Sequence, residues 1–201
     1  MTEKRHIDPE RAATRRRQVL DAAATCFRRS GFHGASMSEI SKAAGMSAGH
    51  IYNYFASKDA IIAAFVEDNV ARVMELIGNI ESQADPLQAI VDDVETSVRN
   101  NIDPEHWALP LEIFAESSRN PVIAALSQDA DRRTRARFRA LLKAGREKYG
   151  LAVDDNTLDG RMETVISLFQ GLQLRALHNP GLPIPGMIDS FRIALKALLF
   201  N

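Results

Sequence analysis

The 201-residue sequence predicts an all-α protein of about nine helices, and three observations support this fold class. Apolar residues recur at the three- and four-residue spacing of amphipathic helices along most of the chain. Aromatic residues make up only 6% of the sequence, and it has no alternating runs of β-branched residues, which are typical of strands. Asp-Pro or Asn-Pro pairs at 8–9, 85–86, 103–104 and 120–121 fit helix starts, with a capping side chain before a proline in the first helical position.

The first predicted helix begins at Pro9, after an Asp8 cap, runs to about Ser30 and ends at Gly31. Its inner stripe is formed by Val19, Leu20, Ala23 and Phe27. Cys26 is the single cysteine, so an internal disulfide is excluded. We expect Cys26 to be a small packed residue rather than a reactive thiol.

Two short helices are predicted between Ser36 and Phe55. Ser36 is a good helix cap, and Glu39, three residues later, completes a capping box. Gly45 ends the first short helix, and Ser47 can cap the second, which is expected to run through Phe55. Two short helices joined by a tight turn that contains glycine form a helix-turn-helix. This motif presents its second helix to the major groove of DNA.

The second short helix has the features of a helix that reads DNA. Ile51 and Phe55, four residues apart, are expected to face the core. The side chains left for the tip and the outer faces are Ala48, Gly49, His50, Tyr52, Asn53 and Tyr54. Small residues in the first turn allow a close approach to base edges, and tyrosine hydroxyls can donate to phosphate oxygens. Lys58, at the start of the next helix, has a charge available for phosphate.

The charge distribution also points to nucleic acid as a partner of the N-terminal part. The net charge of the whole chain is only −1. Residues 1–58, however, contain ten Lys or Arg and five Asp or Glu, whereas the remainder contains 15 and 21. The attraction for phosphate therefore lies where the helix-turn-helix lies. The sequence leaves open whether Arg15, Arg16 and Arg17 contact the DNA backbone or form a solvated arm.

A long ordered motif runs through this region, and it is matched by Ser36, Ile40-Ser41, Ala44-Gly45-Met46-Ser47, Gly49, Tyr52, Tyr54-Phe55 and Ser57-Lys58-Asp59. It resembles the DNA-binding domain of the tetracycline-repressor (TetR) family. That family's pattern is roughly Thr-x-x-x-Ile-Ala, Ala-Gly-Val-Ser-x-Gly-x-x-Tyr-x-Tyr/His-Phe, Ser-Lys-Glu. The resemblance extends from about Arg17 to about Val73. Beyond that point only the helical layout is similar.

The resemblance implies a homodimeric transcriptional regulator, most often a repressor, that a small-molecule ligand releases from double-stranded operator DNA. The residues then expected at the DNA are Ser36, Ser38, Ser47, Ala48, Gly49, His50, Tyr52, Asn53, Tyr54 and Lys58. Ser36 and Ser38 are expected at phosphate, and Ala48, Gly49 and His50 at the bases. Tyr52, Tyr54 and Lys58 are expected to hold the backbone, with Asn53 able to do either. His50 departs from the small or aliphatic residue often found there, so no known operator can be carried over.

A fourth helix is predicted to start at Ser57 and to continue through Val73 and Met74, past the end of a DNA-binding domain. We therefore divide the chain into a helix-turn-helix domain over 9–74, with the motif at 36–55, and a helical ligand-binding and dimerisation domain over 75–201. The further helices are predicted at 85–100, 103–118 and 120–150, then in a helix that Asn156 or Asp155 caps and that ends before Asn179, and from Pro185 to Phe200.

The last two predicted helices are strongly apolar and resemble the four-helix dimer interface of the family. The residues expected there are Met162, Val165, Phe169, Leu172, Phe191, Leu195 and Leu198. The alternative is that these residues only close the core of the protomer. Arg132, Arg133, Arg135, Arg137 and Arg139 spread around a helix cylinder and are interpreted as a solvated surface.

A ligand pocket is expected because the resembled family usually has one, since no spacing in the sequence locates it. The residues that could converge in it are His106, Trp107, Phe114, Phe169, Gln173 and His178. Each of these could equally be an ordinary core or surface residue.

Other function classes find less support in the sequence. The five histidines show no metal-ligand spacing, and no phosphate loop or nucleophile elbow is present, so no cofactor, metal or catalytic residue is expected. No apolar run is long enough to span a membrane, and the cytoplasm is the expected compartment. The alternatives left open are an activator or ligand-independent DNA binder, and a helical ligand carrier or enzyme with a borrowed DNA-binding domain.

Overall fold

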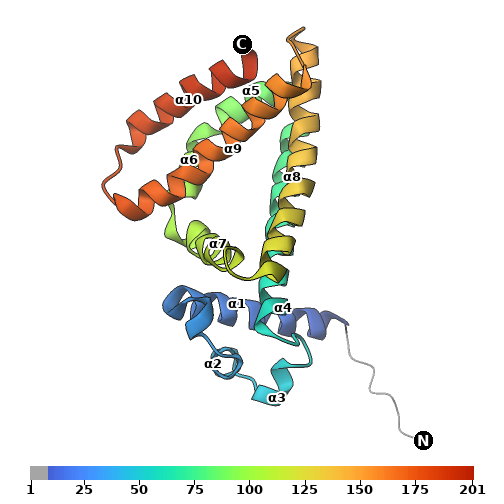
Figure 1. The fold of residues 1–201 in the computed structure, drawn as a ribbon, viewed down its shortest axis with the longest axis vertical. Helices are drawn as coiled ribbons and strands as arrows, with labels where there is room; N and C mark the ends of the chain where they lie inside the picture. Colours follow the sequence, from blue (N-terminus) through green and yellow to red (C-terminus); the bar gives the residue numbers. More distant parts are fainter. Residues whose placement is uncertain (1–8) are drawn as a thin grey trace, which may run out of the picture. The chain divides into compact units, whose positions relative to one another are not determined.

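The computed structural model describes residues 9–201, and that part of the chain forms ten helices and no strands (Figure 1). The helices are α1 Pro9–Gly34, α2 Met37–Ala43, α3 Ala48–Ile51, α4 Lys58–Glu81, α5 Pro86–Asp92, α6 Val94–Ile102, α7 Pro104–Ser117, α8 Pro121–Lys148, α9 Asp155–His178 and α10 Ile184–Phe200. The predicted all-α class is confirmed. The expected Asp8 cap lies outside the described residues.

Between residues 85 and 178, two predicted helix boundaries are wrong. The helix expected over 85–100 is two helices, because Asp93 ends α5 and precedes α6. The Asp93 carboxylate accepts a hydrogen bond from Ser97 Oγ at 3.0 Å and makes no capping bond to the backbone of α6. The cap of α9 is Asp154, one residue before the predicted position. Its Oδ1 accepts from the Thr157 N–H at 3.0 Å, and this bond lowers the pKa of Asp154.

The chain folds as two compact units. The N-terminal unit consists of the residues up to Asp68 together with Ala108–Ser127, and the C-terminal unit consists of Asn69–Trp107 and Gln128–Asn201. Residues 108–127 thus pack with the N-terminal unit, which the division at residue 74 did not anticipate. Two glutamates of α7 explain this placement, because Glu112 accepts a hydrogen bond from the end of α1 and Glu116 lies next to His33 there.

The core of the N-terminal unit forms around α1. The four residues of its predicted inner stripe are all buried, which confirms that prediction. Gly31 has a φ of 67°, a left-handed value that favours glycine, so α1 is interrupted there and only one more turn follows. That turn brings Phe32 against Phe27, with ring centroids 5.4 Å apart. Phe65 of α4 meets Phe27 edge to face at 6.2 Å.

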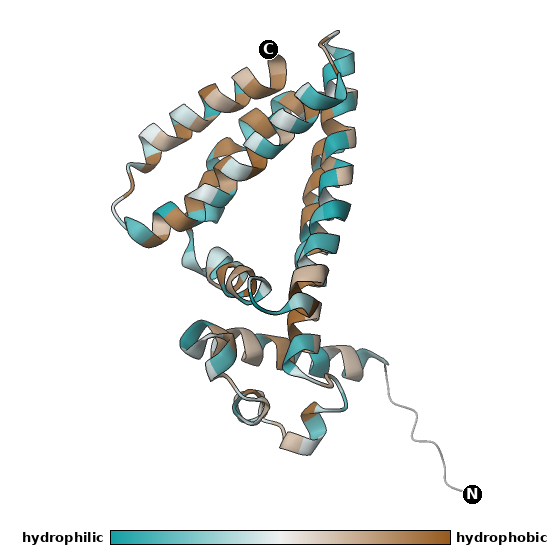
Figure 2. Cartoon of the chain, in the orientation of Figure 1, coloured by the Kyte–Doolittle hydropathy of each residue, from teal (hydrophilic) through white to brown (hydrophobic). Residues whose placement is uncertain are grey.

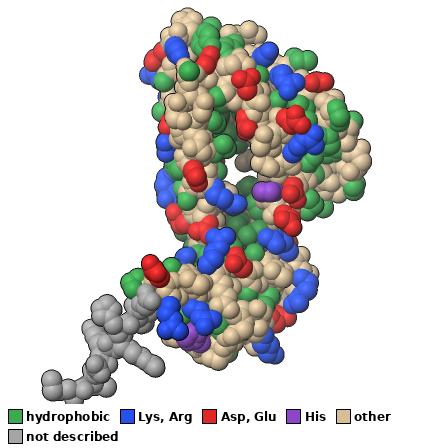
Figure 3. Space-filling model, turned by 180° about the vertical axis from the view of Figure 1, so that it is seen from behind, with side chains coloured by type: hydrophobic (Ala, Val, Ile, Leu, Met, Phe, Trp, Pro, Cys, Tyr) green, Lys and Arg blue, Asp and Glu red, His purple; other side chains and the backbone are tan. Residues whose placement is uncertain are grey.

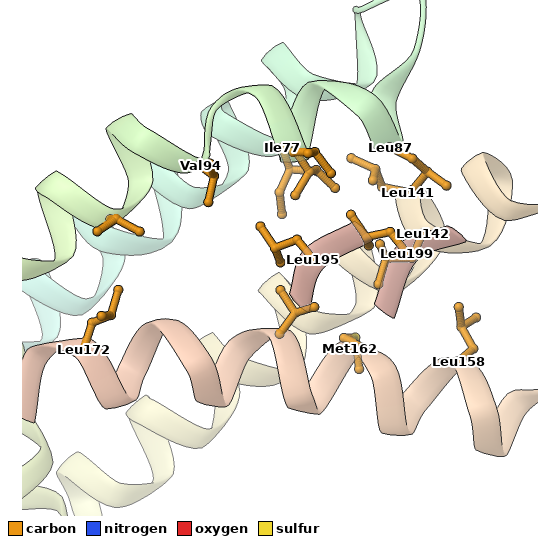
Figure 4. Packing of buried hydrophobic residues seen from close by; sticks show 14 of the residues in the cluster. Ile77, Leu87, Val94, Leu141, Leu142, Leu158, Met162, Leu172, Leu195 and Leu199 are labelled. Atoms are coloured by element: carbon orange, nitrogen blue, oxygen red, sulfur yellow. The ribbon is translucent and has the colours of Figure 1, made fainter. Parts of the chain in front are cut away.

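The core of the C-terminal unit is a single apolar cluster contributed by α4, α5, α6, α8, α9 and α10 (Figure 4). Close packing of α8 on α5 depends on Gly145, because a Cβ at this position would meet Leu87 Cγ at 2.6 Å. Next to Gly145, in the last turn of α8, the buried Arg146 donates to the backbone carbonyls of Ala152, Leu199 and Asn201. The bonds to Leu199 and Asn201 satisfy carbonyls that the end of α10 leaves open.

Helix α8 is hydrophilic along most of its length in Figure 2, where the predicted arginine run lies. Some of these arginines are not simply solvated, because they tie α8 to neighbouring helices. Arg137 donates to Glu81 of α4 at 2.7 Å and lowers the pKa of that carboxylate. Arg139 pairs with Asp155 and Asp159 of α9.

Candidate nucleic-acid interface

Helix α2 begins with the predicted capping box. Ser36 Oγ accepts from the Glu39 N–H at 3.1 Å, and Glu39 Oε2 accepts from the Ser36 N–H at 2.8 Å. The hydrogen bond from the Ser36 N–H lowers the pKa of Glu39. The Ser36 hydroxyl is therefore already used within the protein, whereas Ser38 is exposed.

The turn after α2 is set by Gly45, whose φ of 62° is left-handed. Gln18 of α1 supports this turn by donating from Nε2 to the Ala44 carbonyl at 2.7 Å. Ser47 then caps α3, its Oγ accepting from the His50 N–H at 3.3 Å. The predicted helix-turn-helix is present.

Helix α3 is shorter than predicted. It ends at Ile51, and the chain reaches Phe55 through tight turns in which the Asn53 N–H bonds to the His50 carbonyl and the Tyr54 N–H to the Ile51 carbonyl. Bonds of this three-residue kind do not extend an α-helix. Ile51 and Phe55 are nevertheless buried, as predicted.

The side chains predicted at the tip of α3 are presented to solvent. Ala48, Gly49, His50, Tyr52 and Asn53 are exposed, and Tyr54 is partly buried. A Cβ at Gly49 would meet no atom of the protein within 4 Å. The packing of the protein therefore does not require glycine at this position, and the space outside it is open to a ligand as large as DNA.

The side chain of Lys58 makes contacts that the sequence did not predict. Its ammonium group donates to the backbone carbonyls of Phe32 and Ala35, at 2.8 Å each. The same nitrogen lies 4.6 Å from the centre of the Phe32 ring. This ammonium group therefore binds the start of α4 to the end of α1, and a phosphate contact of Lys58 stays a prediction.

Basic side chains lie across the surface of the helix-turn-helix region on the face shown in Figure 3. The three arginines left open by the sequence differ in their surroundings. Arg16 lies over the Phe55 ring, 4.8 Å from its centre, and Arg17 pairs with Asp21 at 3.2 Å and Asp68 at 3.5 Å. Arg15 donates to the side chain of Gln18 at 2.8 Å.

Two family models match this chain. The model for bacterial regulatory proteins of the tetR family matches residues 19–65, and the model for the C-terminal part of BetI-type transcriptional repressors matches residues 83–199. The second match alone covers more than half of the chain. The chain belongs to the TetR family of transcriptional regulators.

Individual proteins agree with this assignment. The HTH-type transcriptional regulator UidR of Escherichia coli K12 is 31% identical over 146 residues, which cover 71% of each chain. The structure of Salmonella enterica GusR matches 98% of this chain and 99% of its own, at 25% identity and a TM-score of 0.77. A regulator from Saccharomonospora viridis, solved in complex with choline, matches 92% and 95% with 24% identity and a TM-score of 0.68, and shows the shared fold.

The structure does not bring together all the residues predicted for the ligand pocket of this regulator. His106 is exposed and lies 3.3 Å from Asp103, and His178 is exposed in the last turn of α9. Phe114 is half-exposed and belongs to the N-terminal unit, unlike the other five. His106 and His178 are thus surface residues in this structure, and one shared site for the six residues stays a prediction.

Gln173 and Phe169 lie one helical turn apart on α9. Gln173 Nε2 donates to Asn101 Oδ1 at 3.2 Å, while its Oε1 is buried without a hydrogen-bond partner in the described part of the chain. The Phe169 ring packs on Phe191, with centroids 5.4 Å apart. Trp107 Nε1 donates to the Ile102 carbonyl at 3.2 Å.

The residues predicted for the dimer interface lie in, or pack against, the protomer's own core. Met162, Val165, Leu172 and Leu195 are at most 3% exposed, so they have no surface to offer a second chain. Phe169, Phe191 and Leu198 are partly buried against the same cluster. The structure thus supports the alternative stated above, that these apolar stripes close the core of the protomer.

The sequence did not predict two contacts between α7 and the end of α1. Glu112 Oε2 accepts from the Phe32 N–H at 3.1 Å, and the buried Glu116 lies 3.1 Å from His33 Nε2. Arg119 also pairs with Glu116, at 2.9 Å. The available signal was a pair of glutamates four residues apart among the apolar residues of the second half of α7. No helix among the described residues is long and apolar enough to cross a membrane.

Proposed function

We propose that this regulator is a homodimeric repressor, which binds operator DNA through the exposed end of α3 and leaves it when a small molecule binds the C-terminal domain. The observation that carries the proposal is the exposure of Ala48, Gly49 and His50 on a helix fixed from behind by the buried Ile51 and Phe55. Small exposed residues on a rigid support allow the backbone to come close to base edges in the major groove.

Tyrosine and serine hydroxyls around this tip are the groups suited to phosphate. Tyr52 is 54% exposed, and Ser38 is exposed near the start of α2. Such contacts fix the register of a protein on the duplex without reading the sequence. Ser47, which caps α3, lies at the N-terminal end of that helix, next to Ala48.

The dimer contact is proposed on the sides of α9 and α10 that face away from the core. The residues on these two sides, called here the outer face, are Ser167, Gly171, Leu174, Ser190, Ile193 and Ala197. Ile193 is 71% exposed and Leu174 is 49% exposed, which is unusual for large apolar side chains. A Cβ at Gly171 would meet nothing within 4 Å, so this face also has room for close helix packing.

A two-fold dimer explains how a small reading helix reaches useful specificity. Two copies of α3 read two half-sites about one helical turn apart, in a palindromic operator. A ligand that favours a different spacing of the two reading helices lowers the affinity for this operator.

The contacts between α7 and α1 offer a route for such a change. Helix α7 begins with residues of the C-terminal unit and continues into the N-terminal unit. Glu112 and Glu116 of α7 hold Phe32 and His33 at the end of α1. A ligand that displaces α7 would therefore move the helix on which the helix-turn-helix is built. The choline complex of the Saccharomonospora viridis regulator supports a small molecule as the effector class.

The proposal is tested by two measurements on the purified protein. A mobility shift with the DNA upstream of the regulator's own gene should show binding that weakens steeply with salt and that a scrambled duplex does not compete away. Light scattering should give the mass of a dimer. Ile193→Glu should yield monomers that bind this DNA weakly, and Val122→Glu, which alters another exposed apolar side chain, on α8, should remain dimeric. A wild-type monomer, or equal binding to scrambled DNA, would refute the proposal.

A further inference from the structure

Three polar side chains at the exposed end of the helix-turn-helix contact one another. Asn53 Nδ2 lies 3.4 Å from His50 Nδ1, and Tyr54 Oη lies 3.3 Å from His50 Nε2. The rings of His50 and Tyr54 also meet edge to face, with centroids 5.3 Å apart. Both nitrogens of the His50 ring are therefore used within the protein, and neither is left for a base.

The chemistry of these contacts fixes where the hydrogens lie. An amide nitrogen only donates, so His50 Nδ1 accepts from Asn53 and the proton of the neutral ring lies on Nε2. Nε2 then donates to the Tyr54 oxygen, which leaves the Tyr54 hydroxyl proton free to point away from the ring. Asn53 keeps Oδ1 and its second amide hydrogen unused by His50. It therefore presents one acceptor and one donor on a single planar group.

This pattern matches one base edge. In the major groove adenine presents N7 as an acceptor and the N6 amino group as a donor, and asparagine can bind both at once. Guanine presents two acceptors, so Oδ1 of Asn53 would face O6 without a hydrogen between them. We propose that Asn53 is the specificity-determining residue of this regulator, that it reads an adenine in each operator half-site, and that His50 is a positioning residue for Asn53 and Tyr54.

The inference deepens the proposed function and rests on it, because it needs α3 in the major groove. The backbone of His50 is itself held in place, because its main-chain N–H donates to the Ser47 hydroxyl at 3.3 Å. A reading side chain held before binding loses less conformational freedom when the complex forms. Removing His50 should therefore weaken the choice of base at the position that Asn53 reads.

The experiment is a selection from randomised duplexes, followed by competition binding with single-base variants of the selected site. The proteins are the wild type, Asn53→Ala, His50→Ala and the double variant, with Tyr52→Phe as the control. His50, Asn53 and Tyr52 are exposed, so the variants should fold, which circular dichroism checks. Wild type should select an adenine in each half-site, and its replacement by guanine should weaken binding about 5- to 100-fold.

Asn53→Ala should abolish the preference at that one position and retain the others. His50→Ala should reduce the preference at the same position, and the double variant should lose no more than Asn53→Ala alone, because residues that act as one unit are not additive. Tyr52→Phe should weaken binding to all sequences alike.

Two results would overturn the inference while the proposed function stands. In the first, His50→Ala alters a different position from Asn53→Ala and the two losses add, which means that His50 reads its own base. In the second, wild type selects a motif in which no position depends on Asn53. If wild type enriches no motif at all, the proposed function fails and the inference fails with it.

Discussion

Replacement of Lys58 by methionine tests whether the ammonium group holds the protein together or holds DNA. Methionine keeps an unbranched apolar stem against Phe32 but removes both donors to the carbonyls of Phe32 and Ala35. Hydrogen bonds from charged groups contribute about 1.5–3 kcal/mol each. Because Lys58 is only partly buried, water can reach the freed carbonyls, and we expect the lower part of the summed range, about 3–4 kcal/mol.

The assay for Lys58→Met is urea unfolding followed by circular dichroism, together with the salt dependence of DNA binding. The free energy of unfolding should fall by the amount above, while Lys42→Met, which alters an exposed lysine of α2, should change it by less than about 0.5 kcal/mol. The slope of log affinity against log salt should stay as in the wild type. Unchanged stability with a slope lowered by about 0.9 per protomer would refute the reasoning, because that is the signature of a lost phosphate contact.

Three further predictions concern the stability of the fold. Gly145→Ala should lower the free energy of urea unfolding by about 1–3 kcal/mol, because the buried Leu87 has no room to move. Gly160→Ala, the control, should be neutral or stabilising. A harmless Gly145→Ala would contradict the close packing of α8 on α5. Arg146→Met should cost about 3 kcal/mol or more by leaving three carbonyls without their donors, and a smaller effect than that of a surface arginine would argue against the cap. Asp154→Asn should destabilise the fold at neutral pH. Because the folded pKa of Asp154 is lowered, the difference in the free energy of unfolding between wild type and variant should shrink as pH falls below about 4. A constant difference from pH 7 to pH 3 would exclude the charged cap.

The helix-turn-helix could be predicted from the sequence because its determinants are local. Ser36 and Glu39 form a capping box within four residues, and Gly45 alone supplies the left-handed backbone of the turn. The burial of Ile51 and Phe55 likewise follows from their spacing on one face. Motifs of this kind need no knowledge of the rest of the fold.

The contacts that the sequence did not predict join residues far apart in the chain. Lys58 meets the carbonyls of Phe32 and Ala35, more than 20 positions away, and a free charge next to a DNA-binding motif gives no sign of such a partner. Glu112 and the end of α1 are separated by 80 positions. Helical periodicity indicates that a face is apolar, but it does not indicate what covers that face.

The same limit explains why the sequence alone could not tell a core stripe from a dimer interface. Met162 and Leu195 lie on apolar stripes that fill the core of the protomer, whereas the outer face carries small residues with only two large apolar side chains, Leu174 and Ile193. A stripe of this mixed composition is weak in a sequence. It becomes visible only when the buried sides of α9 and α10 are known.

The proposed function depends most on two protomers that present α3 to one palindromic duplex. Native mass spectrometry of the wild-type protein with the duplex recovered by selection measures this directly, with a scrambled duplex of the same length as the reference. We expect two chains on one selected duplex and no stable complex with the scrambled duplex at the same salt concentration. One chain per duplex, or equal occupancy of both duplexes, would contradict the account.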